Sequence, residues 1–127
     1  MIKKEVIYYS GCSMGGFETC ELLENNKVKV STLDSGEKIT DIQEYKILTF
    51  WDRIEETGIW KWKKNYTNPV EMTDGYDWEL KLRDRNGRAK YCTGYESYPR
   101  KFKYFIKELN YLFGSKIEFQ RVFDDLL

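Results

Sequence analysis

Alternating and β-branched residues predict three strands near the start of the chain, over residues 2–9, 17–24 and 27–34. In the third, valines alternate with lysines, which is typical of a strand with one buried face. Glycines and an Asn-Asn pair between these segments predict turns. Residues 37–40 are expected to extend the sheet further.

An amphipathic helix is predicted next. Its apolar residues occur at i, i+3, i+4 and i+7 and form one face: Ile47, Phe50, Trp51 and Ile54. Two pairs have the spacing of a capping box at the helix start, Thr40 with Gln43 and Asp41 with Glu44. Gly58 is placed to end the helix.

A hairpin is predicted in the second half of the chain. Residues 59–66 alternate tryptophan with lysine and indicate a strand or an extended edge. The clearest alternation, over residues 76–83, predicts another strand. Asn86-Gly87 is a strong hairpin signal, so the chain is expected to return over residues 88–93.

A second helix is predicted between Pro99, which suits a first helical turn, and Gly114, which suits a stop. Its apolar residues share one face: Phe102, Phe105, Ile106, Leu109 and Phe113. Ser97 is a candidate cap for its start. Residues 115–127 have apolar residues at helical spacing and a capping-box pair at their start, which favours a short final helix over a strand.

The predicted order of elements is βββ-α-β-ββ-α-α. This order favours an α+β fold with a single antiparallel sheet of about 5–6 strands and helices packed on one face. A chain of 127 residues is expected to form one domain, residues 1–127, with a substantial core.

Apolar and turn residues of the second half form a distinctive pattern: Trp60, Trp62, Asp74, Gly75, Trp78, Leu80, Leu82, Gly94, Tyr98, Pro99 and Phe102. The pattern, which spans residues 58–113, resembles that of small, largely uncharacterised bacterial α+β domains, some of them lipoproteins. The resemblance implies the fold and no activity, because the matched positions are packing and turn residues. No lipobox or signal peptide is recognised, so a lipoprotein role is not carried over.

Composition bounds the environment of the protein. Lys and Arg total 21, as do Asp and Glu, so no net charge draws the chain to nucleic acid or to membranes. No apolar run approaches the roughly 20 residues that span a bilayer. Three widely spaced cysteines argue against a disulfide framework and indicate a reducing compartment. These observations predict a cytoplasmic protein without a membrane partner.

The sequence contains no histidine. This absence excludes Ser-His-Asp and Cys-His catalysis, histidine metal ligation and histidine pH switching. No Cys-x-x-Cys motif is present, which argues against a structural zinc site. We therefore expect a non-enzyme with no catalytic residues, no metal and no cofactor.

The segment between Gly11 and Gly16 has the glycine spacing of a phosphate-binding loop. Phe17-Glu18 stands where that motif has Lys followed by Ser or Thr, and a strand follows instead of a helix. A flexible hairpin loop is the favoured interpretation, with Met14 as an interaction tip and Cys12 as an idle or redox-sensitive thiol.

Asp74, Asp77 and Glu79 lie close to tryptophans in the sequence, as carboxylates do in sugar-cleaving sites. A turn explains Asp74, and the solvated face of a strand explains the other two. A glycan-binding or small-ligand module would instead use the aromatic residues Trp60, Trp62, Tyr76 and Trp78.

Residues 81–107 form a basic segment with nine Lys or Arg against two acids, a local net charge of +7. A two-residue turn at Asn86-Gly87 would place Arg83 opposite Lys90 and Arg85 opposite Arg88, which is mildly destabilising. A wider Asp84–Gly87 turn would change these pairings. Either carboxylates of neighbouring strands (Glu5, Glu18 or Glu21) or an anionic partner would compensate the charges.

The face of the second helix opposite its apolar stripe interleaves bases with tyrosines, which can bind RNA, single strands or an acidic protein. A solvated face is the equal alternative. The candidate partner-binding residues are Lys81, Arg83, Arg85, Arg88, Lys90, Arg100, Lys103, Tyr104, Lys107, Tyr111 and Met14.

Three functions remain. The leading hypothesis is a binding protein that occludes a partner enzyme or nucleoprotein complex, as an immunity-type or phage anti-defence inhibitor does. The second is a nucleic-acid-binding accessory protein that uses the basic segment 81–107. The third is the glycan or small-ligand module.

Overall fold

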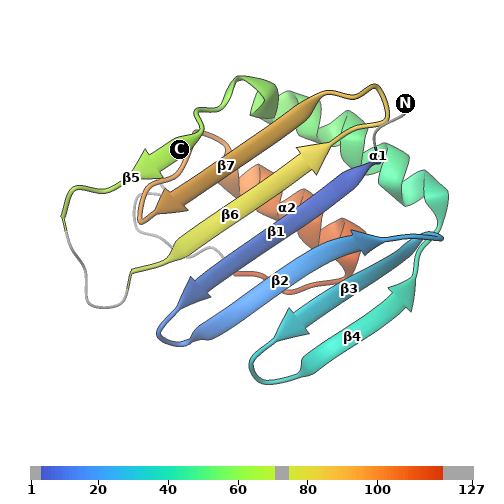
Figure 1. Cartoon of the computed structure of the whole chain (residues 1–127), viewed down its shortest axis with the longest axis horizontal. Coiled ribbons are helices and arrows are strands. Elements are labelled where there is room, and N and C mark those ends of the chain that lie inside the picture. The colour runs from blue at the N-terminus through green and yellow to red at the C-terminus, as the bar shows by residue number, and fades with distance from the viewer. Residues whose placement is uncertain (1–3, 71–74, 119–127) are drawn as a thin grey trace.

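The protein has an α+β fold with one mixed sheet of seven strands and two α-helices (Figure 1). The computed structural model describes residues 4–70 and 75–118. The strands are β1 (Val6–Ser13), β2 (Gly16–Leu23), β3 (Lys27–Thr32), β4 (Gly36–Asp41), β5 (Asn65–Thr67), β6 (Asp77–Arg83) and β7 (Ala89–Tyr95). The helices are α1 (Glu44–Ile54) and α2 (Phe102–Phe113), with short 3₁₀ turns η1 (Glu55–Thr57) and η2 (Ile59–Lys61) after α1.

The strand order is β4-β3-β2-β1-β6-β7-β5. All neighbours are antiparallel except β5, which runs parallel to β7. The prediction of an α+β fold with a single, mostly antiparallel sheet is therefore confirmed, but the sheet has seven strands rather than about 5–6, and β5 makes it mixed. Strand β5 runs parallel to β7 because the chain passes from β5 to β6, which lies on the other side of β7 and is antiparallel to it.

Both helices lie on the same face of the sheet (Figure 1). The core forms between that face and the helices, where alternate residues of the central strands meet the apolar stripes of α1 and α2. Fully buried examples are Ile7, Tyr9, Leu80, Phe50 and Phe105. No helix among the described residues is long and apolar enough to cross a bilayer. The cytoplasmic location stays a prediction.

The helix faces are as predicted, but the helix starts are not. Every residue predicted for the two apolar stripes is buried. At the start of α1, neither predicted capping box forms, because Gln43 is the N-cap residue and makes no side-chain cap bond. Helix α2 begins at Phe102 rather than at Pro99, after Lys101 in a left-handed conformation with φ of 67°. Ser97 does not cap it.

The strand predicted over residues 59–66 is mostly absent. Gly58, with φ of 70°, turns the chain into η2, and only residues from Asn65 onward join the sheet, as β5. The buried side chains are Ile59 and Trp62, which are three residues apart as a 3₁₀ turn requires. This spacing of three competes with the alternation of tryptophan and lysine that predicted the strand.

The final helix predicted over residues 115–127 does not begin at Ser115. Residues 115–118 are not helical, and the side-chain amide of Asn110 binds this segment instead. Asn110 Nδ2 donates to Ile117 O at 2.9 Å, and Ile117 N donates to Asn110 Oδ1 at 3.0 Å. The rest of the predicted helix lies outside the described residues.

Candidate functional site

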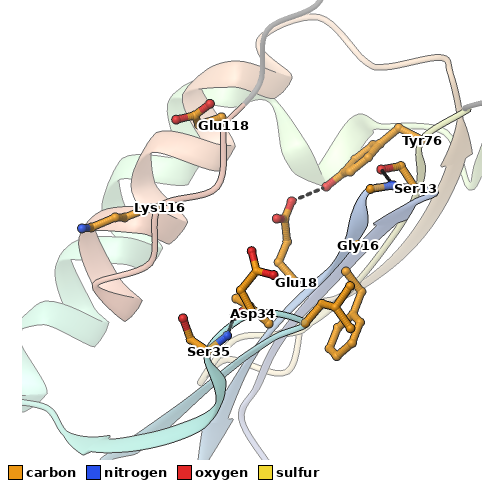
Figure 2. A pocket seen from close by; sticks show the side chains of 12 residues that line it. Ser13, Gly16, Glu18, Asp34, Ser35, Tyr76, Lys116 and Glu118 are labelled. Atoms are coloured by element: carbon orange, nitrogen blue, oxygen red, sulfur yellow. Dashed lines mark hydrogen bonds between the residues drawn. The ribbon is translucent and has the colours of Figure 1, made fainter.

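A hollow of about 560 Å³ lies at one end of the sheet, where the β1–β2 and β3–β4 turns approach the segment that follows α2. Figure 2 shows Glu18 and Asp34 on one side of this hollow and Lys116 and Glu118 on the other. Its lining residues are Ser13, Gly15, Gly16, Phe17, Glu18, Thr32, Leu33, Asp34, Ser35, Tyr76, Lys116 and Glu118. We call this end of the sheet, with its two turns, the tip end.

The β1–β2 turn is shorter than the loop predicted between Gly11 and Gly16. Strand β1 continues through Cys12 to Ser13, which pairs with Gly16, so that only Met14 and Gly15 turn the chain. Gly15 N donates to Ser13 Oγ at 3.3 Å. The turn is therefore a preformed edge of the hollow.

The β3–β4 turn is also fixed by a side chain. Ser35 N donates to Thr32 Oγ1 at 3.0 Å, and Gly36, with φ of 69°, begins β4. Leu33 of this turn lies against Gly16 of the neighbouring hairpin, since a Cβ built on Gly16 would be 3.5 Å from Leu33. The two turns thus form one continuous edge.

Three large apolar side chains are exposed along the tip end. The exposed fraction is 76% for Met14, 41% for Phe17 and 63% for Leu33. Phe17 and Leu33 also line the hollow. Grouped exposed apolar side chains beside a cavity are typical of a binding surface, whereas scattered single ones are not.

A chain of hydroxyl groups leads from the core to the hollow. The Tyr9 and Tyr76 hydroxyl oxygens lie 2.7 Å apart, and Tyr76 Oη donates to Glu18 Oε1 at 2.9 Å (Figure 2). Because the Tyr76 proton is directed to Glu18, the Tyr9 hydroxyl donates to Tyr76. Tyr9 is fully buried, and Glu18 is half-buried at the wall of the hollow.

Gly11 makes this arrangement possible. It lies in β1 opposite Glu18 of β2, and a Cβ at this position would stand 1.8 Å from the Tyr76 hydroxyl oxygen. The ring of Tyr76 therefore occupies the space that a side chain at position 11 would fill. The glycine that resembled part of a phosphate-binding loop serves close packing instead.

The protonation states follow from burial. Burial raises the pKa of Tyr9 and of Tyr76 above the ordinary phenol value, so both hydroxyls stay protonated at neutral pH. Burial also raises the pKa of the Glu18 carboxyl, and the nearby Glu118 adds to the rise, while the bond from Tyr76 opposes it. The site can thus present an oriented carboxylate to a ligand.

We expect Glu18→Gln to raise the free energy of unfolding at neutral pH by at most about 1 kcal/mol, because the half-exposed carboxylate is screened by solvent. A raised native pKa means that ionisation of Glu18 opposes folding as pH rises above its unfolded value of 4.5. The amide oxygen of glutamine can still accept the Tyr76 proton. Urea denaturation from pH 4 to pH 8 measures the difference, which should grow as pH rises.

A variant that loses stability at neutral pH would contradict this assignment, since it would show that the Glu18 carboxylate stabilises the fold when ionised. Glu24→Gln is the matched control. Glu24 follows the same strand but is solvent-exposed and pairs with Lys4 at 3.3 Å.

The predicted basic residues of the hairpin are largely engaged by the chain itself. The turn is the wider alternative: Asp84 N donates to Arg88 O at 2.9 Å, and Arg83 pairs with Ala89 rather than with Lys90. The like charges of Arg83 and Lys90 are therefore not opposite each other.

Neighbouring carboxylates and aromatic rings compensate these charges. Arg85 binds Glu5 at 3.1 Å and Glu44 at 3.3 Å, so that Glu5 alone of the three acids considered from the sequence has this role. Arg88 binds the buried Asp84 at 2.8 Å and also Glu55. Among the other hairpin bases, Lys81 lies over the rings of Tyr8 and Tyr91, and Lys90 Nζ donates to Trp62 O at 2.7 Å.

The candidate residues of α2 are more accessible. Tyr104 and Tyr111 are about half-exposed, and Lys107 is exposed, as is Arg100 just before the helix. Tyr104 and Lys107 line a smaller hollow of about 330 Å³ beside Arg53 and Glu56 of the α1 region, whereas Tyr111 lies under Lys46. Lys103 lies over the Tyr104 ring at 5.6 Å. The structure thus separates Met14 at the tip end from these residues.

The aromatic residues of the glycan alternative do not form one platform. Trp62 and Trp78 are buried in the core, at 7% and 2% exposure, and Trp60 stacks on Trp51. Tyr76 alone lines the hollow at the tip end. Asp74 lies outside the described residues. In the described part of the chain, no group of three or more Cys, Asp or Glu side chains is arranged to hold a metal ion.

The sequence did not single out the polar chain of Tyr9, Tyr76 and Glu18 as a site. Tyr76 and Glu18 are 58 residues apart, and no local pattern links them. No protein-family model, curated protein or solved structure matches the chain. The site must therefore be interpreted from its own geometry.

Proposed function

We propose that the protein is a non-catalytic binding protein that occludes a partner enzyme or nucleoprotein complex, as an immunity-type or anti-defence inhibitor does. The tip end is the surface that makes the contact. The observation that carries this proposal is the grouping of three exposed apolar side chains beside the hollow: Met14 and Leu33 on two turns, and Phe17 at the start of β2.

Two properties of the tip end support a role in occlusion. Its turns are short, and backbone N–H groups of Gly15 and Ser35 donate to the side-chain oxygens of Ser13 and Thr32, so little conformational entropy is lost when a partner is bound. Its exposed apolar side chains lie beside a hollow with oriented polar groups, and such side chains can act as anchors in a protein interface.

The hairpin bases support the nucleic-acid alternative less well. Arg85 and Arg88 are paired with carboxylates of the chain, which neutralise the charge that phosphate contacts would need. We therefore propose no second function from residues 81–107.

Substitution of the tip end tests the proposal. We expect Met14→Gln combined with Leu33→Gln to weaken partner binding about 30-fold or more, the effect of losing interface anchors worth about 2 kcal/mol. The tagged full chain is used to capture proteins from the cells that encode it. The captured partner is then purified, and its affinity for wild type and variant is measured by calorimetry.

Leu48→Gln is the matched control, because Leu48 is 44% exposed on α1, away from the tip end. It should bind as wild type does. Equal loss in both variants, or no loss in the tip variant, would contradict the proposal. Binding that is lost above about 0.5 M salt and after nuclease treatment would favour nucleic acid instead.

A further inference from the structure

Among the residues that the structure describes, those lining the hollow at the tip end carry more negative than positive charge. Glu18, Asp34 and Glu118 contribute three carboxylates, and Lys116 contributes one ammonium group. No ion pair within 4.0 Å joins Lys116 to any of the three. Figure 2 shows the side chains of Glu18 and Asp34 on the same side of the hollow, with the Lys116 ammonium pointing away from them.

Several buried or partly buried carboxylates near the sheet are paired with a cation of the chain, whereas Glu18, like Glu79 of β6, accepts a tyrosine hydroxyl instead. Glu5 is paired with Arg85, Asp84 with Arg88, and Glu21 with Lys29. Glu18 has no such cation among the residues that the structure describes, although it is half-buried and one of its oxygens is held by Tyr76. Carboxylates removed from water are normally paired, so a bound cation would suit this position beside Glu18.

The rest of the hollow suits the stem of a long basic side chain. Phe17 and Leu33 provide apolar surface at the rim, against which the methylene groups of Lys or Arg can pack while the charged head reaches deeper. A volume of about 560 Å³ is within the range of clefts that bind side-chain-sized and larger ligands.

We propose that the hollow receives a Lys or Arg side chain of the partner protein, whose cationic head is bound by Glu18 and Asp34. This inference rests on the proposed function, because it names the chemistry of the partner at the same surface. Tyr76 orients Glu18 for that contact, and Gly11 leaves room for Tyr76. An acidic partner segment or a nucleic-acid phosphate is repelled by the same carboxylates.

Small probes test the chemistry without knowledge of the partner. Nα-acetyl-arginine N-methylamide and its lysine counterpart are titrated into the ¹⁵N-labelled full chain, and backbone amide shifts are followed by NMR. We expect saturable shifts in residues 15–18 and 33–35. Nα-acetyl-citrulline N-methylamide, which has nearly the shape of the arginine probe without its charge, should cause none.

Variants then assign the contact. Glu18→Gln should weaken probe binding about tenfold, as loss of a charge-assisted hydrogen bond does. Asp34→Asn, at an exposed turn, is expected to weaken it by a smaller factor, and Glu24→Gln should leave it unchanged. Equal binding of the citrulline probe, shifts confined to other surfaces, or an unchanged affinity in Glu18→Gln would each overturn the proposal.

The two proposals can fail separately. If Met14→Gln with Leu33→Gln loses the partner but the basic probes do not bind at Glu18, the occlusion function stands and the basic side chain is excluded. If the probes bind at Glu18 but partner binding survives the tip substitutions, the cation site stands as a small-ligand site. The proposed occlusion surface, and with it the partner's basic side chain, is then excluded.

Discussion

Phe105→Ala should lower the free energy of unfolding by about 3–5 kcal/mol, the usual cost of removing a buried phenylalanine. Phe105 is fully buried at the middle of α2. Its ring lies 6.3 Å from Tyr9 of the sheet, 6.3 Å from Phe50 of α1 and 5.8 Å from Trp62. The side chain therefore joins both helices, the sheet and the segment after α1, and its loss leaves a cavity at their common point.

Urea denaturation followed by fluorescence measures this cost. Phe17→Ala is the control of equal chemistry, because Phe17 is 41% exposed on a strand, and its removal should cost less than about 1 kcal/mol. Similar midpoints for the Phe105 and Phe17 variants would mean that α2 does not pack on the sheet as described.

Trp78→Ala should cost a similar amount, about 3–5 kcal/mol, by a partly different mechanism. Trp78 is 2% exposed in β6, and its ring packs 4.7 Å from that of Phe102 and stacks on Tyr98. Its indole Nε1 donates to Ser97 O at 3.0 Å. The substitution removes a large apolar volume and also leaves the Ser97 carbonyl without this donor.

Trp78→Phe separates the two contributions. It keeps an aromatic ring and removes the indole N–H, so its cost should fall between those of wild type and Trp78→Ala, with about 1 kcal/mol attributable to the hydrogen bond. Equilibrium denaturation of the three proteins gives the comparison. If the phenylalanine variant is as unstable as the alanine variant, the stability depends on the specific shape of the indole ring and not on the apolar area that is buried.

The packing of Trp78 explains why the sequence pattern of the second half includes a glycine at position 94. A Cβ on Gly94, which pairs with Trp78 across β6 and β7, would lie 2.2 Å from Trp78 Nε1. The indole therefore lies directly over the backbone of Gly94. The same relation holds for Gly11 and Tyr76 at the tip end. In both cases the glycine makes room for a partner far away in the sequence.

The periodicity of apolar residues was sufficient to predict the buried faces of the two helices. The stripe of α1 and that of α2 were predicted residue by residue, because a spacing of three and four admits few other structures. It failed at Trp60 and Trp62, where alternation over a few residues matched a strand, although a left-handed Gly58 directs the chain into a 3₁₀ turn. The secondary structure of such a short segment depends on its tertiary contacts more than on its own residue pattern.

The candidate site could not be predicted in the same way. Glu18 is a polar residue on an ordinary strand, and its importance depends on Tyr76, which arrives from another part of the chain. The basic residues near the hairpin were prominent because they are adjacent in sequence, whereas their carboxylate partners Glu5, Glu44 and Glu55 are not. A cluster of basic residues can be recognised in the sequence, but the distant carboxylates that neutralise it cannot.

The pairing of β1 with β6 at the centre of the sheet has a consequence for biosynthesis. Each of the strands β1, β2 and β3 pairs with the next strand in the sequence, so these hairpins can form early. Strand β1 also pairs with β6, where Val6 is opposite Arg83, and this pairing can form only after β6 has been synthesised. Such long-range closure slows folding. As the chain leaves the ribosome, one edge of β1 stays unpaired until β6 emerges. Until then, strands of other nascent chains can pair with that edge, and the pairing of β6 with β1 prevents this association.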